Sequence, residues 1–245
     1  MSKQNCLLPR LILIACGSFS PTTLMHLRMF EIARNHLMER GAFKVIGGIM
    51  SPVHDAQRKQ GLVAGVHRLA MLRLALRTSN WIRVSDWELQ QPQWTSTVDV
   101  LKYHKDCINN VLKDKAEGKR NIVLPHWLPA EVTERTEEVH LKFLAGADLL
   151  ETFADPQLWT NAEVEGMCSY GLVIVSRFGS EIEKFIFESD ILSKYSRNIE
   201  LVTNWSTNNM SSTYIRRLLK RDKSVKYLID DDVIEYIRKY NLYNC

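Results

Sequence analysis

The sequence has few cysteines, and their arrangement argues against a domain stabilised by disulfides or by zinc. The five cysteines stand at positions 6, 16, 107, 168 and 245. They are odd in number, scattered, and without the close spacing of metal ligands, so we expect neither a disulfide framework nor a zinc site. Unpaired thiols are typical of a reducing compartment, and we therefore expect an intracellular protein, cytoplasmic, nuclear or both.

Long hydrophobic runs are also absent. No apolar stretch approaches the roughly 20 residues of a membrane-spanning helix, so no membrane span is expected. The segment Leu13–Cys16 resembles a lipoprotein cleavage box, but the apolar stretch before Cys16 is only Leu11–Ala15. This is shorter than the ~7–15 residues of a signal-peptide core. A secreted or lipidated binding protein is therefore disfavoured.

The common nucleotide-binding fingerprints are missing as well. The chain has neither G-x-x-x-x-G-K-[ST] nor G-x-G-x-x-G, which argues against a P-loop protein and a standard dinucleotide dehydrogenase. Its net charge is +4, and no dense stripe of Lys and Arg occurs, so no nucleic-acid partner is expected. A mildly positive chain is compatible with small anionic ligands such as phosphates.

The chain does contain a regular alternation of strand-like and helix-like segments. Its 245 residues, 45% hydrophobic and 24% charged, suit a single domain over 1–245. Apolar runs predict strands at 11–16, 43–50, 81–86, 139–146, 171–177 and 199–205. Helical periodicity predicts helices at 25–40, 66–78, 96–114 and in a C-terminal helical part over 211–241. The polar residues 115–138 predict a surface excursion, expected to be mobile.

This alternation predicts βαβ units and therefore an α/β fold with a mainly parallel sheet. Right-handed crossovers then place helices on both faces, in a Rossmann-like, doubly wound arrangement. Ligands of such sheets bind beyond the carboxyl ends of the strands. Residues 17–26, 51–59 and 146–148, together with Arg177, follow or end predicted strands, so we expect them at one edge.

The segment GSFSPTTLMH, residues 17–26, has the parts of a phosphate site at such a strand end. Gly17 leaves the backbone open to a ligand, and the N–H groups at the start of the next helix can face an anion. His26 lies in the first turn of that helix and can donate to a phosphate oxygen. Taken alone, Gly17 also suits a plain turn, and His26 suits a structural or exposed histidine.

In context, these residues resemble the G-x-F-x-P-x-T-x-x-H motif of the adenylyl- and cytidylyltransferases that carry a T/H-x-G-H signature. The signature here reads Thr23-Leu24-Met25-His26, and Met25 in place of Gly is typical of the animal nicotinamide mononucleotide adenylyltransferases. The resemblance covers about residue 10 to 243, without the long central insertion of some animal isoforms. Further segments resemble this family in its chain order: SPVHDAQRKQGL (51–62), WIRVSDWE (81–88), GADLLETF (146–153), LW (158–159) and SSTYIRR (211–217).

The resemblance implies adenylyl transfer from ATP to nicotinamide mononucleotide (NMN), which gives NAD and pyrophosphate in NAD biosynthesis. It extends to nicotinic acid mononucleotide as a second acceptor. The 5′-phosphate of the mononucleotide attacks the α-phosphorus of ATP, and Mg²⁺ is bound through the ATP phosphates. Because the substrate phosphate is the nucleophile, the protein must align two polyanions and neutralise charge. No metal-binding residues are expected.

The same resemblance makes His26 and Arg216 catalytic, with His26 beside the α-phosphate and Arg216 on the β- and γ-phosphates. On the residues alone, Arg216 suits a solvated helix face, Asp148 a helix N-cap, and the Ser/Thr group of SSTYIRR plain capping. The resemblance places the other ATP or NAD contacts at Gly17, Ser18, Phe19, Gly146, Asp148, Arg177, Asn208, Ser211, Ser212 and Thr213.

A second set of residues resembles the family's mononucleotide site. Lys59, by itself an ordinary surface lysine, is implied to bind the mononucleotide phosphate. Trp94, Thr97, Leu158 and Trp159 are implied to surround the pyridine ring, a planar cation in NMN that suits an indole face. The remaining tryptophans are expected in packing: Trp81, Trp87, Trp127 and Trp205.

Two alternatives stay open at this point. Another nucleotidyltransferase of the same superfamily, with a different phosphorylated acceptor, would keep His26 and Arg216 but would not need Trp94 and Trp159. Some animal family members are also reported to act as chaperones for client proteins. The residues neither favour nor disfavour that role, a homo-oligomer, or a preference between NMN and its acid form.

Overall fold

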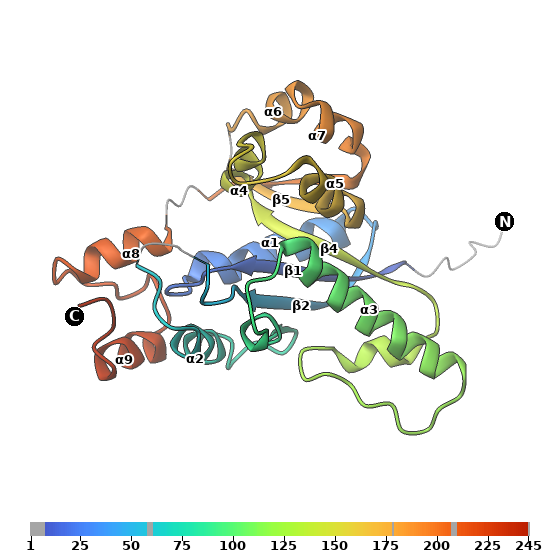
Figure 1. The fold of residues 1–245 in the computed structure, drawn as a ribbon, viewed down its shortest axis with the longest axis horizontal. Helices are drawn as coiled ribbons and strands as arrows, with labels where there is room; N and C mark the ends of the chain where they lie inside the picture. The colour runs from blue at the N-terminus through green and yellow to red at the C-terminus, as the bar shows by residue number, and fades with distance from the viewer. Residues whose placement is uncertain (1–7, 58–60, 178, 207–209, 245) are drawn as a thin grey trace.

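A computed structural model describes residues 8–57, 61–177, 179–206 and 210–244 (Figure 1). Within these ranges six strands form one parallel sheet in the order β3-β2-β1-β4-β5-β6. The strands are β1 (Arg10–Gly17), β2 (Lys44–Pro52), β3 (Ile82–Val84), β4 (Val139–Gly146), β5 (Leu172–Arg177) and β6 (Ile199–Asn204). The predicted α/β fold with a Rossmann-like parallel sheet is confirmed, and the strand order reverses between β1 and β4.

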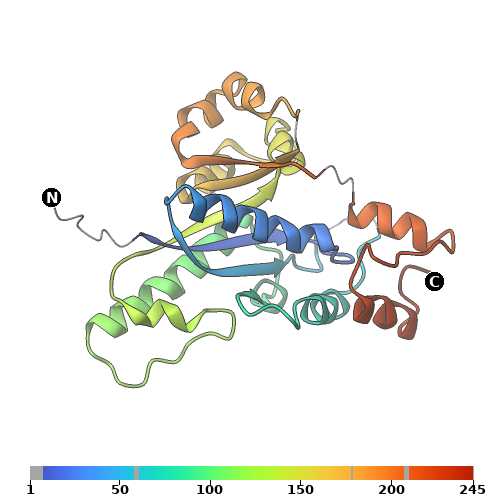
Figure 2. The same cartoon turned by 180° about the vertical axis from the view of Figure 1, so that it is seen from behind.

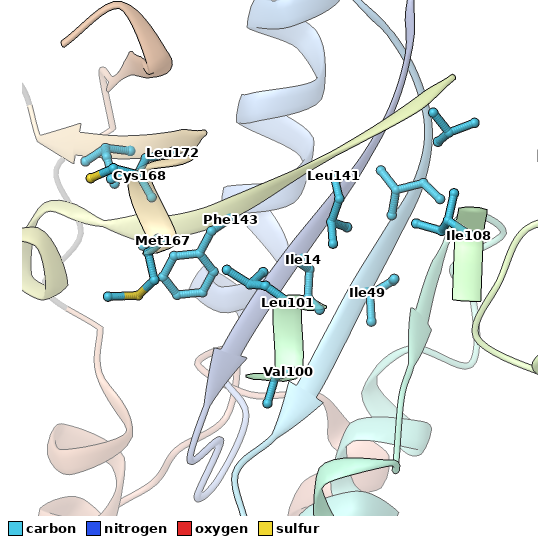
Figure 3. Packing of buried hydrophobic residues seen from close by; sticks show 14 of the residues in the cluster. Ile14, Ile49, Val100, Leu101, Ile108, Leu141, Phe143, Met167, Cys168 and Leu172 are labelled. Carbon is cyan, nitrogen blue, oxygen red and sulfur yellow. The ribbon is translucent and has the colours of Figure 1, made fainter. Parts of the chain in front are cut away.

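β1 is buried on both faces because its side chains alternate between two cores. Leu11 and Leu13 pack in one cluster with residues of α1 (Leu24–Glu39), including Phe30. Ile12 and Ile14 belong to the opposite cluster, with residues of α3 (Thr97–Ala116). Figure 3 shows Ile14 in this second core beside Leu101. The continuous apolar run therefore marks a central strand, as predicted.

Helices cover both faces of the sheet. α1 and α2 (Gly65–Ala75) lie on one face, which faces the viewer in Figure 2. α3, α4 (Ala147–Glu151) and α5 (Asn161–Tyr170) lie on the other, and α6 (Ile182–Glu188) and α7 (Asp190–Lys194) connect β5 to β6. None of the described helices is long and apolar enough to span a membrane.

The C-terminal helices return the chain to the carboxyl end of β1. α8 (Ser212–Leu219) and α9 (Asp231–Lys239) lie beside α2 in both views (Figures 1 and 2). A third apolar cluster holds them there, with Ile215 and Val233 packed among residues of α2 that include Met71. This packing places the start of α8 close to the loop that follows β1.

The carboxyl ends of the strands meet at one edge, as predicted. Parallel pairing aligns Gly17 with Pro52 at the ends of β1 and β2. Gly146 is aligned with Val175 on β5, and Arg177 with Asn204 on β6. Segments that are distant in sequence therefore lie together at the carboxyl ends of the strands.

The predicted surface excursion at 115–138 is wrong for its second half. Trp127, Leu128 and Val132 are buried in the core on the α3 side of the sheet. The buried guanidinium of Arg10 donates to the carbonyl oxygens of residues 131, 132, 135 and 137, and this fixes the segment beside β1. A buried guanidinium needs such acceptors, and they come from a part of the chain more than 100 residues away.

Candidate functional site

A cleft of ≈ 460 Å³ lies at the carboxyl ends of β1, β4 and β5. The loop after β1, the first turn of α1, the start of α4 and the start of α8 line it. The structure brings together here ten of the residues that the sequence predicted: Gly17, Ser18, Phe19, His26, Gly146, Asp148, Ser211, Ser212, Thr213 and Arg216.

Gly17 gives the loop after β1 its shape by leaving room for an aromatic ring. A Cβ atom at Gly17 would lie 3.3 Å from the Phe19 ring, which is tighter than most such contacts. Phe19 is 4% exposed and has a φ of 44°. Its ring meets the His26 imidazole edge-on, with 5.3 Å between centroids. The absence of a side chain at Gly17 therefore allows the Phe19 ring to pack against the His26 ring.

A reciprocal cap at the start of α1 fixes the His26 ring. The Thr23 backbone N–H donates to His26 Nδ1 over 2.9 Å, and the His26 N–H donates to Thr23 Oγ1 over 3.4 Å. Nδ1 is therefore an acceptor, and a neutral imidazole carries its proton on Nε2. Protonation of Nδ1 would break the bond from Thr23. With Nδ1 facing Thr23, Nε2 is the ring nitrogen that can donate to a ligand in the cleft.

The SSTYIRR segment is bonded directly to the loop after β1. Arg216 Nη1 donates to the Ser20 carbonyl oxygen over 2.8 Å, and Nη2 donates to Thr213 Oγ1 over 3.2 Å. Ser212 Oγ donates to the Pro21 carbonyl oxygen over 2.8 Å. Ser211 is the N-cap of α8 and accepts from the Tyr214 N–H. Two predicted phosphate-binding segments, almost 200 residues apart, thus form one wall.

The remaining residues predicted on the ATP side are placed in part. Asp148 is exposed at the first turn of α4, and Gly146 precedes it as the N-cap. The backbone of Arg177 ends β5 next to Val175 and Ser176, which line the cleft. The Arg177 side chain, Lys59 and Asn208 lie outside the described part of the structure.

Comparison with known proteins now decides the family. A family model described as cytidylyltransferase-like matches residues 14–218. The chain is 42% identical over 258 residues to nicotinamide/nicotinic acid mononucleotide adenylyltransferase 1 of Bos taurus, covering 98% of this chain and 91% of that protein. The chain belongs to the nicotinamide/nicotinic acid mononucleotide adenylyltransferase family. The resemblance seen in the motifs is thus confirmed.

One further relative and one solved structure are also similar to this chain. A nicotinamide-nucleotide adenylyltransferase of Drosophila melanogaster is 53% identical over 248 residues; the match covers 100% of this chain but spans only 64% of that protein's length. A solved structure from Vibrio parahaemolyticus, assigned as a nicotinate-nucleotide adenylyltransferase, aligns over 96% of this chain and 95% of its own with a TM-score of 0.52. At 14% identity, this second likeness shows the shared fold.

The residues that resemble the family's pyridine site lie outside the ≈ 460 Å³ cleft. Trp159 Nε1 donates to Thr152 Oγ1 over 2.9 Å, and Thr152 itself lines the cleft. Trp94 is 46% exposed just before α3, and Leu158 is 60% exposed just before α5. Thr97 is half-buried at the start of α3. Of these residues, Trp159 is bonded to a residue that lines the cleft, and the others stand outside the cleft lining.

The start of α3 packs closely against the middle of α5. A Cβ atom at Gly166 of α5 would lie 3.0 Å from the Val98 side chain of α3, so these helices meet at a glycine. Elsewhere, Trp87 stacks on Tyr103 with 4.1 Å between centroids, as expected for a packing residue. Trp205 differs from its predicted packing role, because it is 75% exposed after β6.

A second cavity, of ≈ 640 Å³, lies along α1. It reaches residues 78–82 and Tyr227, and it shares Met25, Asn204 and Met210 with the first cleft. None of the described residues that the family resemblance assigns to the site lines it. The ten predicted residues named above line the first cleft instead.

Sequence reasoning missed a buried carboxylate beside the end of β2. Glu88 is 2% exposed, accepts from the His54 N–H over 3.2 Å, and accepts from Ser51 Oγ over 3.3 Å. Burial raises the pKa of Glu88 to about 7, and the bonds from His54 and Ser51 and the charge of Arg68 oppose this rise. A glutamate within WIRVSDWE gives no local sign of burial, because its environment is tertiary.

We expect Glu88→Gln to stabilise the protein at pH 8 and to have little effect at pH 5. The pKa of Glu88 in the folded protein lies above its ordinary value. Its contribution to the free energy of unfolding is therefore complete below about pH 4.5 and is lost as the pH rises through about 7. A neutral glutamine does not undergo this loss, so at pH 8 the free energy of unfolding should rise by about 1–3 kcal/mol. Each 1 kcal/mol raises Tm by roughly 2–4 °C. Thermal unfolding from pH 5 to 8 measures it, with exposed Glu39→Gln as the control; equal pH dependence in both variants would contradict the prediction.

Proposed function

We propose that this protein transfers the adenylyl group of ATP to NMN, giving NAD and pyrophosphate, and that it accepts nicotinic acid mononucleotide as well. One observation carries the proposal: the loop after β1 and the start of α8, the two predicted phosphate-binding segments, are hydrogen-bonded to each other beside His26. His26, Arg216 and the hydroxyls of Ser211–Thr213 line a single cleft at the switch point of the sheet. The relatives named above support the choice of substrates.

The proposed chemistry needs no nucleophile from the protein. An oxygen of the mononucleotide 5′-phosphate forms a bond to the α-phosphorus, and the bond from that phosphorus to the bridging oxygen of the β-phosphate breaks. Charge then accumulates on the departing pyrophosphate. Arg216 and the start of α8 would neutralise it, while the Nε2–H of His26 donates to an α-phosphate oxygen. The residues thus act by alignment and charge stabilisation.

Magnesium fits the cleft as part of the MgATP substrate. Among the described residues, no group of three or more His, Cys, Asp or Glu side chains could hold a metal ion. Asp148 lines the cleft together with several hydroxyls. Mg²⁺ is commonly held by one or two carboxylates, substrate phosphates and water. We therefore infer that the ATP phosphates supply most of its ligands.

We expect Trp94→Ala to raise KM for NMN more than KM for ATP. The half-exposed indole is available to the cationic nicotinamide ring, and loss of a cation–π partner weakens binding by about 0.5–2 kcal/mol, several-fold to tens-fold. Steady-state kinetics with each substrate varied in turn measures the split. An equal change in both KM values would show that Trp94 has a structural role.

The proposed function is tested by synthesis of NAD on the purified protein. MgATP and NMN should give NAD and pyrophosphate in equal amounts, and nicotinic acid mononucleotide should give the acid dinucleotide. Pantetheine phosphate and glycerol phosphate, offered with ATP and with CTP, serve as control acceptors. Adenylylation or cytidylylation of a control acceptor without NAD synthesis would favour another member of the superfamily. An oligomer, client proteins and an intracellular location stay predictions from the sequence.

A further inference from the structure

The connection between β2 and α2, described at residues 53–57 and 61–64, is tied to the loop after β1 by one buried arginine. Arg68 of α2 is 0% exposed. Its Nη1 donates to the Ser18 carbonyl oxygen over 3.1 Å. Its Nη2 donates to the Val53 carbonyl oxygen over 2.6 Å and to Asp55 Oδ1 over 2.7 Å, and its Nε donates to the Val63 carbonyl oxygen over 2.9 Å. One side chain thus joins three segments.

Other hydrogen bonds also connect these three segments. The Val53 N–H donates to the Gly17 carbonyl oxygen over 3.0 Å. Asp55 also accepts from the Gly65 N–H over 2.9 Å, so its carboxylate bridges Arg68 and the start of α2. The connection is therefore bonded directly to Gly17 of the phosphate loop, and Arg68 links it to the next residue, Ser18.

The far end of the connection lies against the other phosphate segment. Gly61 has a φ of +78°, and a Cβ atom there would lie 3.1 Å from Arg216 Nε and 3.8 Å from the guanidinium carbon. Glycine adopts this conformation without strain and leaves the Arg216 side chain its space. The connection thus touches the phosphate loop at one end and Arg216 at the other.

We propose that Arg68 and Gly61 are positioning residues, which hold the phosphate loop and Arg216 in register through the described residues 53–57 and 61–64. This inference rests on the proposed adenylyl transfer. Neither residue contacts a reacting atom; each acts through Ser18 or Arg216. The role suits arginine because a planar guanidinium with five donors can satisfy four acceptors in different directions, whereas an ammonium cannot. Displacing an aligned group by about 1 Å can lower a rate as much as 10²-fold.

The first test is Arg68→Lys, with Arg73→Lys on the same helix as the control. Arg73 is exposed, and its Nη2 pairs with Asp86 over 3.1 Å. We expect the Arg68 variant to lose about tenfold in kcat, measured well below its own Tm and per folded molecule, with a smaller change in either KM. A purely structural role would lower Tm but leave kcat of the folded fraction as in the wild type.

The second test avoids the core and decides the matter if Arg68→Lys does not fold. Gly61→Ala is compared with Gly118→Ala, whose φ is +73° but whose Cβ would meet nothing within 4 Å. Both variants should lose a little stability because of the positive φ, and Gly61→Ala should lose no less than Gly118→Ala because its Cβ also meets Arg216. Only Gly61→Ala should lower kcat/KM for ATP, by about fivefold, with kcat/KM for NMN less affected.

The outcomes separate this inference from the function on which it rests. A wild-type protein that makes no dinucleotide would refute the proposed function. The positioning role alone would be overturned by a different set of results. In that case the wild type is active, Gly61→Ala and Gly118→Ala have the same kcat/KM for ATP, and folded Arg68→Lys has a normal kcat. If Arg68→Lys fails to fold, equality of the two glycine variants is sufficient to overturn it.

Discussion

His26→Ala should lower kcat by about 10²–10³, the usual loss when one preorganised donor to a developing charge is removed. The Ala variant keeps Arg216, the hydroxyls of α8 and the backbone amides of the phosphate loop, so nucleotide binding should weaken much less. Steady-state turnover with both substrates saturating, together with a binding isotherm for ATP, measures the two effects separately.

The cap that holds His26 predicts a small effect on stability. His26→Ala removes the acceptor for the Thr23 N–H, and Thr23 is 1% exposed. The loss is on the order of 1 kcal/mol, which lowers Tm by roughly 2–4 °C. The variant should therefore stay folded at the assay temperature. An unfolded variant would mean that His26 holds the loop, and wild-type turnover in a folded one would refute its catalytic role.

Two further variants separate the cap from the donor. Glutamine and glutamate at this third helical position can both accept from the Thr23 N–H, as in an ordinary capping box. Both His26→Gln and His26→Glu should therefore regain the Tm of the wild type. Only glutamine offers an N–H, so it should recover part of the lost rate, while glutamate should be no faster than alanine. Equal rates for the two would show that the imidazole itself is required.

The features that could be predicted from the sequence are the local ones. The run Leu11–Cys16 indicates a strand buried on both faces, and the glycine after it marks the end of that strand. The alternation with helices then fixes which segments meet at the carboxyl edge. The T-x-x-H spacing is a family motif and also the spacing of a capping box, and the Thr23–His26 bonds show that physical role.

The features that could not be predicted depend on partners distant in the chain. Arg68 lies in a segment that reads as a mostly buried helix, yet nothing nearby shows that its acceptor is the Ser18 carbonyl 50 residues earlier. The segment 115–138 is polar by composition, but the Arg10 guanidinium fixes part of it in the core. A buried charged group is stable only where such acceptors converge, and their convergence is a property of the fold.

Arg216→Lys should lower kcat/KM for ATP by about 10- to 100-fold. Arg216 bonds to the Ser20 carbonyl oxygen and to Thr213 through two different nitrogens of one plane, which orients the guanidinium at the start of α8. Lysine keeps the charge but has a single ammonium, so it cannot hold both partners and also form a two-pronged contact with a phosphate. Hydrogen bonds to charged groups contribute about 1.5–3 kcal/mol, which corresponds to this range.

The neighbouring Arg217 provides the matched control, because it is exposed on the same helix and has no assigned role. Arg217→Lys should have the kinetics of the wild type, and Tm should change by no more than a few degrees in either variant. The loss in the Arg216 variant should fall mainly on ATP, because the loop and α8 meet where the resemblance places the β- and γ-phosphates. Near-normal ATP kinetics in Arg216→Lys would leave Arg216 as a tie between α8 and the loop after β1, with its charge unused in the reaction.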